Sequence, residues 1–174
     1  MVGNGIPKLV ERFTPPEHRD PETLKQVLAE FSARYDTHKE DKTAPYPGMV
    51  ELIRRLDAAG VVTAVLSNKA DDLAGPVVER YYPGLFSVVQ GALPGVPVKP
   101  DPALLHRLMD RMGADPENTL FVGDSNVDIQ TAKNGDLPGC GVLWGFRSRQ
   151  ELETEGADVL VQTPEELERV ILGQ

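Results

Sequence analysis

The stretch that decides the fold is Thr119-Leu120-Phe121-Val122-Gly123-Asp124-Ser125-Asn126-Val127-Asp128. Its first four residues form an almost entirely apolar run, which predicts a β-strand buried on both faces. A helix over residues 126–133 is expected to follow the strand, and a strand that leads directly into a helix is half of a parallel βαβ unit. Ligands of open parallel sheets bind beyond the carboxyl ends of the strands. Asp124 and Asp128 therefore stand where a ligand is expected.

Strand and helix patterns alternate on both sides of this stretch. The β-branched run Val61–Leu66 predicts another strand that is buried on both faces. Asp101-Pro102 is typical of a helix start, because aspartate caps a helix and proline fits its first turn. Further strands are predicted at 86–89, 141–144 and 158–161, and helices at 48–59, 70–81, 101–112, 148–155 and 164–172. The predicted fold class is α/β, a parallel sheet with helices on both faces.

Residues 1–43 have a different character. Apolar residues recur there at helical spacing, first at Ile6, Leu9, Val10 and Phe13 and again between Leu24 and Tyr35. No strand pattern interrupts them. We therefore predict a small helical module over 1–43 and an α/β domain over 44–174.

Composition narrows the class of protein. The 174 residues carry a formal net charge of −9, which argues against binding to nucleic acid or to an anionic membrane, since both attract basic surfaces. No apolar stretch approaches the roughly 18 residues that span a membrane, and the N-terminus does not have the pattern of a secretory signal. The only cysteine, Cys140, lies in an apolar run and is interpreted as a buried hydrophobic residue. These features predict a cytoplasmic protein.

Three polar segments stand at strand ends or helix entries. Ser67 and Asn68 follow the strand predicted at 61–66, Lys99 precedes a helix, and Asp124 and Asp128 follow the strand at 119–122. Hard cations such as Mg²⁺ prefer carboxylate oxygens and share phosphate oxygens with a substrate. A lysine neutralises charge on phosphoryl oxygens. The combination predicts a phosphate site beside a magnesium ion, although each segment alone is more often a helix cap, a surface lysine or a turn.

Together these segments resemble the conserved motifs of the haloacid dehalogenase superfamily. Leu66-Ser67-Asn68-Lys69 resembles its second motif, Val98-Lys99-Pro100-Asp101-Pro102 its third, and Gly123–Asp128 its fourth. Val2-Gly3-Asn4-Gly5 and Pro45-Tyr46-Pro47-Gly48 are similar to the helical cap of phosphoglycolate phosphatases and its return to the core. The resemblance implies a Rossmann-like α/β core with a partial helical cap, and a Mg²⁺-dependent phosphatase of small phosphorylated substrates.

The resemblance also implies a role for each residue. Ser67 and Lys99 would be catalytic and would bind the phosphoryl group, with Asn68 beside them. Asp124 would bind Mg²⁺, and Asp128 would support that ion directly or through water. Asn4 would line the substrate pocket from the cap.

The family's first motif, D-x-D, is not found near this N-terminus. In the family it supplies the aspartate that forms a phosphoaspartate, at the end of a strand lying between those predicted at 61–66 and 119–122. We expect a truncated or mis-started phosphatase; a degenerate protein is the alternative. We also expect the two flanking strands to close up, to borrow a segment from a neighbour, for instance in a homo-oligomer through exposed sheet edges, or to be poorly stable.

Two other functions remain open from the sequence. One is a catalytically inactive module that binds phosphate and metal, or a partner protein, which the missing nucleophile favours. The other is a sugar-phosphate mutase or a phosphonatase of the same superfamily, since these share the core and differ in the cap.

Overall fold

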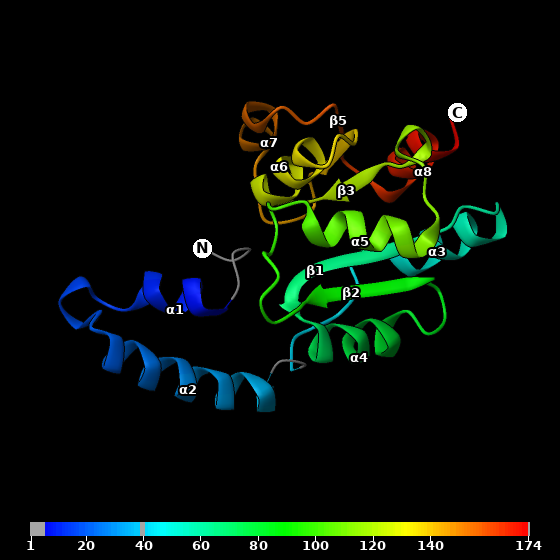
Figure 1. Ribbon diagram of the computed structural model, residues 1–174. Helices are drawn as coiled ribbons and strands as arrows, with labels where there is room; N and C mark the ends of the chain where they lie inside the picture. Colours follow the sequence, from blue (N-terminus) through cyan, green and yellow to red (C-terminus); the bar gives the residue numbers. More distant parts are fainter. Residues whose placement is uncertain (1–5, 39–40, 174) are drawn as a thin grey trace. The chain divides into compact units, whose positions relative to one another are not determined.

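The computed structural model describes residues 6–38 and 41–173 (Figure 1). Their contacts divide the chain into two units, residues 1–45 and 46–174. Each unit is described by itself. The proposed Asn4 contact lies outside the described residues.

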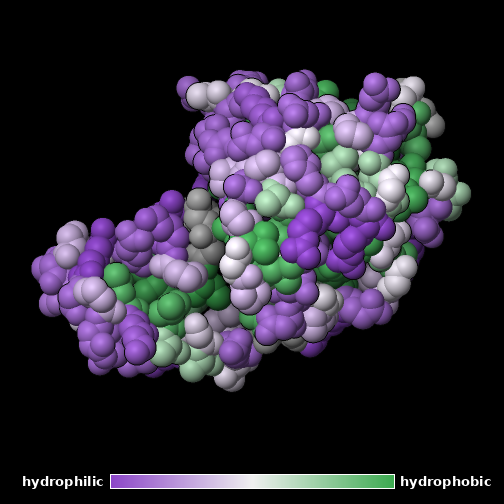
Figure 2. Space-filling view, in the orientation of Figure 1, coloured by the Kyte–Doolittle hydropathy of each residue, from purple (hydrophilic) through white to green (hydrophobic). Residues whose placement is uncertain are grey.

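The first unit is built from helices. It contains α1 (Ile6–Phe13), a short 3₁₀ turn (Pro16–His18) and α2 (Pro21–His38). Aromatic rings join the two helices, since the Phe13 and Phe31 ring centroids lie 5.9 Å apart and Phe31 stacks on Tyr35. Figure 2 shows hydrophobic side chains gathered between α1 and α2 and hydrophilic side chains outside them.

The second unit alternates helices and strands. Its helices are α3 (Met49–Ala58), α4 (Asp71–Tyr81), α5 (Ala103–Met112), α6 (Asn126–Asn134), α7 (Arg149–Glu155) and α8 (Pro164–Leu172). Its strands are β1 (Ala64–Ala70), β2 (Val88–Ala92), β3 (Phe121–Gly123), β4 (Gly139–Val142) and β5 (Val159–Val161), and a 3₁₀ turn spans Pro116–Asn118. Every strand pair is parallel. The predicted α/β class is confirmed.

The strands form two sheets rather than one. β1 pairs with β2, and β3, β4 and β5 form a second sheet in that order (Figure 1). Within the described part of the chain no ladder joins β1 to β3, so the two strands have not closed up. One edge of β3 is therefore open.

Hydrogen bonding identifies the backbone groups on that edge. Phe121 N donates to Pro138 O at 3.0 Å, which directs the main chain of Phe121 toward β4. Successive residues of a strand direct their N–H and C=O groups to alternate sides. The N–H and C=O of Val122 therefore face the open edge.

Burial follows the pairing. β4 has a neighbour on each side and all four of its residues are buried, whereas every residue of β1 is partly exposed or exposed and Val122 of β3 is 37% exposed. The prediction that Val61–Leu66 and Thr119–Val122 are buried on both faces was therefore wrong. The physical reason is that β1 and β3 each have a single neighbouring strand among the described residues.

The first boundary of β1 also differs from the prediction. Val61 belongs to the turn that caps the C-terminus of α3, because its N–H donates to Leu56 O at 2.9 Å beyond Gly60, whose φ is +79°. The strand begins at Ala64 and continues to Ala70, with an irregular register between Leu66 and Ala70. Ser67 and Asn68 consequently lie within the irregular end of the strand and not after it.

The two faces of β4 explain how helices cover both sides of the larger sheet. A Cβ on Gly139 would contact Ala132 of α6 at 3.2 Å, and one on Gly141 would lie 3.1 Å from Leu152 of α7. These two glycines therefore let α6 and α7 approach one face closely.

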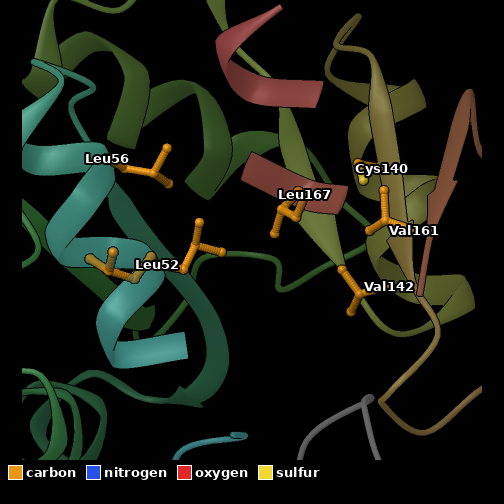
Figure 3. Packing of buried hydrophobic residues seen from close by; sticks show 7 residues of the cluster. Leu52, Leu56, Cys140, Val142, Val161 and Leu167 are labelled. Carbon is orange, nitrogen blue, oxygen red and sulfur yellow. The ribbon is translucent and has the colours of Figure 1, made fainter. Parts of the chain in front are cut away.

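The opposite face carries the main core. Cys140 and Val142 pack there with Val161 of β5, with Leu52 and Leu56 of α3 and with Leu167 of α8 (Figure 3). Helices thus lie on both faces of the sheet, as predicted. Burial raises the pKa of the Cys140 thiol to about 11, so the thiol stays protonated and unreactive near neutral pH.

No helix among the described residues has both the length and the apolar character needed to cross a membrane. The cytoplasmic location stays a prediction.

We predict that Gly141→Val destabilises the protein by about 1–3 kcal/mol, because the added side chain overpacks the space between β4 and α7. Its Cβ alone would lie 2.6 Å from the Leu160 side chain. Urea denaturation of the purified variants measures the change. Gly75→Ala in α4 is the control, since nothing lies within 4 Å of a Cβ there and alanine favours a helix. Equal stabilities of Gly141→Val and the unmodified chain would contradict this packing.

Candidate functional site

The site begins with a clamp between the end of β1 and the loop that carries Lys99. The Asn68 side chain accepts a hydrogen bond from Lys99 N (2.8 Å) through Oδ1 and donates to Lys99 O (2.9 Å) through Nδ2. Both bonds go to the main chain of Lys99. A side-chain amide thus pairs with the backbone of a residue 31 positions later in the sequence.

The Lys99 ammonium is held by one group from β1 and one from the first turn of α6. Its Nζ donates to Leu66 O of β1 at 3.1 Å and forms an ion pair with Asp128 Oδ1 at 2.7 Å. The side chains of the pair are only 12% and 10% exposed. Nζ also lies 5.7 Å from the centroid of the Phe121 ring of β3. The positive charge is therefore fixed in position and partly desolvated.

Both carboxylate oxygens of Asp128 are engaged, one by Lys99 and the other by Ser125 at the start of α6. Its Oδ2 accepts hydrogen bonds from Ser125 Oγ (2.6 Å) and Ser125 N (3.1 Å), and Ser125 Oγ caps Asp128 N in return. This reciprocal pattern is a capping box. Gly123 permits it, because a Cβ at that position would collide with the Asp128 side chain.

Asp124 is held by the loop after β4. Its Oδ2 accepts the Phe146 N–H at 2.9 Å, and Gly145 leaves room for the carboxylate, since a Cβ there would overlap it. Burial, and to a smaller extent the charge of Asp124, raise the pKa of the Tyr46 phenol. The Tyr46 hydroxyl therefore lies within the electrostatic reach of Asp124.

Ser67 occupies the irregular end of β1. Its Oγ accepts the Lys69 N–H at 3.1 Å, which turns the backbone locally. The hydroxyl proton can then be directed toward a ligand.

Hydrogen bonds and ion pairs join some of the predicted residues into connected sets. Asn68, Lys99 and Asp128 form one connected set, and Asp124 belongs to a second set with Gly145 and Phe146. Among residues 6–38 and 41–173, no group of three or more histidine, cysteine, aspartate or glutamate side chains could hold a metal ion together. The described protein groups thus offer a cation the Asp124 carboxylate rather than a closed cage.

That donor set fits Mg²⁺ better than a metal that needs an all-protein cage. Magnesium is usually held by one or two carboxylates and completes its shell with water and substrate phosphate oxygens. Asp128 is less suited to direct binding, since Lys99 and Ser125 engage its two oxygens. Of the two predicted metal ligands, Asp124 is thus better placed than Asp128 to bind the ion directly.

Sequence reasoning missed the groups that hold the predicted residues. The carbonyl of Leu66 and the N–H of Phe146 act through the main chain, which leaves no signature in residue type. The sequence Trp144-Gly145-Phe146 after a predicted strand was the one available signal, because a glycine at a strand end permits close approach of a neighbour.

Comparison with known proteins gives the family. The profile of haloacid dehalogenase-like hydrolases matches residues 1–136. The chain belongs to that family. The relationship predicted from the three motifs is therefore confirmed.

Individual relatives agree with the family profile. The chain is 32% identical over 165 residues to a phosphoglycolate phosphatase of Pseudomonas putida, covering 92% of this chain and 60% of that protein. It is 31% identical to a phosphoglycolate phosphatase of Mesorhizobium japonicum, covering 92% of this chain and 72% of that protein. The chain thus spans about three fifths to three quarters of the length of these relatives.

A solved structure agrees with the fold. The crystal structure of a candidate phosphoglycolate phosphatase from Lactobacillus delbrueckii subsp. bulgaricus superimposes with a TM-score of 0.92. The two chains are 33% identical, and the match covers 99% of this chain and 80% of that one. The described part of the chain therefore shares the α/β fold of that structure.

In this member of the family we predict that Lys99→Met lowers the free energy of unfolding by roughly 3–5 kcal/mol, because it leaves a nearly buried carboxylate without its cation. Chemical denaturation measures the loss. Lys99→Met combined with Asp128→Asn is expected to recover part of it, since the uncompensated charge is then removed.

Arg55→Met is the matched control. Arg55 forms two hydrogen bonds to Glu168 at 2.7 and 2.9 Å, but on the surface, where ion pairs contribute little. Similar losses for Lys99→Met and Arg55→Met would contradict the distinction between the two pairs.

Proposed function

We propose that this protein is a Mg²⁺-dependent phosphomonoesterase whose substrate is a small acidic phosphate of the 2-phosphoglycolate type. The observation that carries the proposal is the fixed ammonium of Lys99, which is anchored to Leu66 O and Asp128 beside the end of β1. A preorganised cation stabilises the charge of a transferring phosphoryl group without having to reorganise.

The other residues receive roles that suit their chemistry. Ser67 donates its hydroxyl proton to a phosphoryl oxygen, while its Oγ stays oriented by Lys69 N. Asp128 acts mainly through Lys99, because its oxygens are already engaged. The role in substrate binding that the family resemblance implies for Asn4 stays a prediction.

Asp124 would hold the magnesium ion, with Asp128 supporting it through water. The ion supplies charge neutralisation at the phosphoryl oxygens when it is bound. The Phe146 N–H fixes one carboxylate oxygen of Asp124, and the other oxygen would be available to bind the cation.

Catalysis in this family proceeds through a phosphoaspartate, and we propose the same route here. Residues 1–174 contain no D-x-D sequence to supply the nucleophile, so that aspartate would come from outside these residues. The contribution of this chain is to bind, orient and neutralise the phosphoryl group, which is the larger part of phosphoryl-transfer catalysis.

A second candidate function is binding of phosphate and metal without turnover. It is favoured by the engagement of Asp128 with Lys99 and Ser125, which removes a second carboxylate from use as a nucleophile. A mutase or a phosphonatase would use the same core residues, and only the cap and the substrate would differ.

We predict that the purified chain binds 2-phosphoglycolate in a Mg²⁺-dependent manner and that Asp124→Ala weakens this binding by about tenfold or more, since a charge-assisted contact through the cation is lost. Isothermal titration with and without Mg²⁺ measures binding, and phosphate release is assayed in parallel. Asp57→Ala, a change to an exposed aspartate in α3, is the control.

Each result has a clear meaning. Phosphate release that Asp124→Ala abolishes supports the enzyme and places a nucleophile within residues 1–174. Binding without release supports a chain whose nucleophile lies elsewhere, or the binding module. An absence of Mg²⁺-dependent binding would refute both candidate functions.

We also propose a homo-oligomer formed through the open edge of β3. Exposed strand edges invite pairing with another chain, because their N–H and C=O groups are unpaired. The edge carries the main-chain groups of Val122, next to a side chain that is 37% exposed.

Val122→Pro is expected to reduce the oligomeric fraction, because proline removes an N–H on the open edge while the ladder to β4 remains. Light scattering after size-exclusion chromatography measures the mass over a range of concentrations. Phe121→Pro is the comparison, since it removes the bond to Pro138 O and should lower stability instead. A chain that is monomeric at all concentrations would sink the idea.

A further inference from the structure

The Asn68 side chain is directed at the main chain of Lys99. It presents an acceptor to Lys99 N at 2.8 Å and a donor to Lys99 O at 2.9 Å. The carboxamide therefore pairs with the N–H and C=O of Lys99 as a residue of a neighbouring strand would. An amide side chain supplies both the acceptor and the donor that these two groups need.

The two hydrogen bonds from Asn68 fix the main chain of Lys99, and therefore the position of its Cα. Its ammonium is then anchored at the far end by Leu66 O and Asp128 Oδ1. Of these four hydrogen bonds at Lys99, three therefore come from β1, two from Asn68 and one from Leu66. The position of the charge depends on the position of the main chain, because the side chain is held at both ends.

We propose that Asn68 is a positioning residue, which acts on the phosphate through Lys99 and not by contacting the substrate. This replaces the substrate-binding role that the family resemblance implies for Asn68, and it rests on the proposed phosphate site. Loss of the amide leaves two backbone groups of Lys99 without their partner and lets the loop move away from β1. The ammonium then loses its fixed position beside the proposed phosphate site, and phosphate binding weakens.

A double-mutant cycle separates a direct role from a role through Lys99. The unmodified chain, Asn68→Ala, Lys99→Met and the double variant are titrated with inorganic phosphate in the presence of Mg²⁺. We expect Asn68→Ala to weaken phosphate binding about tenfold and to have no further effect once Lys99 is replaced. Losses that multiply in the double variant would show a direct contact between Asn68 and phosphate and would overturn the proposal.

A second measurement does not depend on phosphate binding. Reductive methylation followed by peptide mass spectrometry gives the labelling rate of the Lys99 amine, with the exposed Lys25 as the internal reference. Asn68→Ala is expected to raise the Lys99 rate about fivefold, because the ion pair with Asp128 loosens, and to leave Lys25 unchanged.

Asn134→Ala is the matched control. The Asn134 side chain donates to Pro100 O at 2.8 Å, so it holds the residue after Lys99 without contacting Lys99 itself. An equal rise in the two variants, or no rise in Asn68→Ala, would overturn the positioning role. If the unmodified chain binds no phosphate, the proposed function fails while the labelling result still decides whether Asn68 positions Lys99.

Discussion

The ion pair between Lys99 and Asp128 is the interaction on which the site depends, because it connects two sheets that no strand ladder joins within residues 6–38 and 41–173. Lys99 follows the first sheet in sequence and also contacts Leu66 of β1, while Asp128 belongs to α6 beside the second sheet. The apolar cluster of Leu105, Met109 and Leu137 supplements this link, since Leu66 and Phe121 both pack against it. The ion pair and the packed apolar side chains thus supply contacts that a continuous sheet would replace by strand hydrogen bonds. Because Lys99 and Asp128 belong both to this link and to the candidate site, the chemistry of the site and the stability of the domain are coupled.

Much of the architecture could be predicted from the sequence, because periodicity reports which elements alternate. The last helix was predicted with its observed limits at Pro164 and Leu172, since a threonine cap, a proline and a following glycine mark both ends. The strands were placed less accurately. The apolar character of Val61 and Val62 does not distinguish a strand from the turn that ends a helix. Val61 belongs to the turn at Gly60, because its N–H donates to Leu56 O of α3.

The candidate site was predicted by residue type but not by arrangement. Ser67, Asn68, Lys99, Asp124 and Asp128 all stand at the carboxyl ends of strands or at helix entries, as the spacing indicated. The pattern could not show that Asn68 pairs with the main chain of Lys99, or that Asp128 serves a helix cap as well as a lysine. Such contacts depend on two loops meeting in space, and Asn68 and Lys99 are 31 residues apart. The sequence predicted a missing strand between β1 and β3, but it could not decide whether the two strands would close up or stay apart.

The hydrogen bond between Phe146 and Asp124 uses the main chain of Phe146 and not its side chain. Only the N–H of Phe146 serves the carboxylate, and every residue except proline supplies that group. The phenyl ring is 65% exposed and is not needed for the bond. Position 146 can therefore change in size, shape or polarity while the acid beside it stays in place. A substitution at position 146 can thus alter the surface beside Asp124 without removing the hydrogen bond that holds the carboxylate.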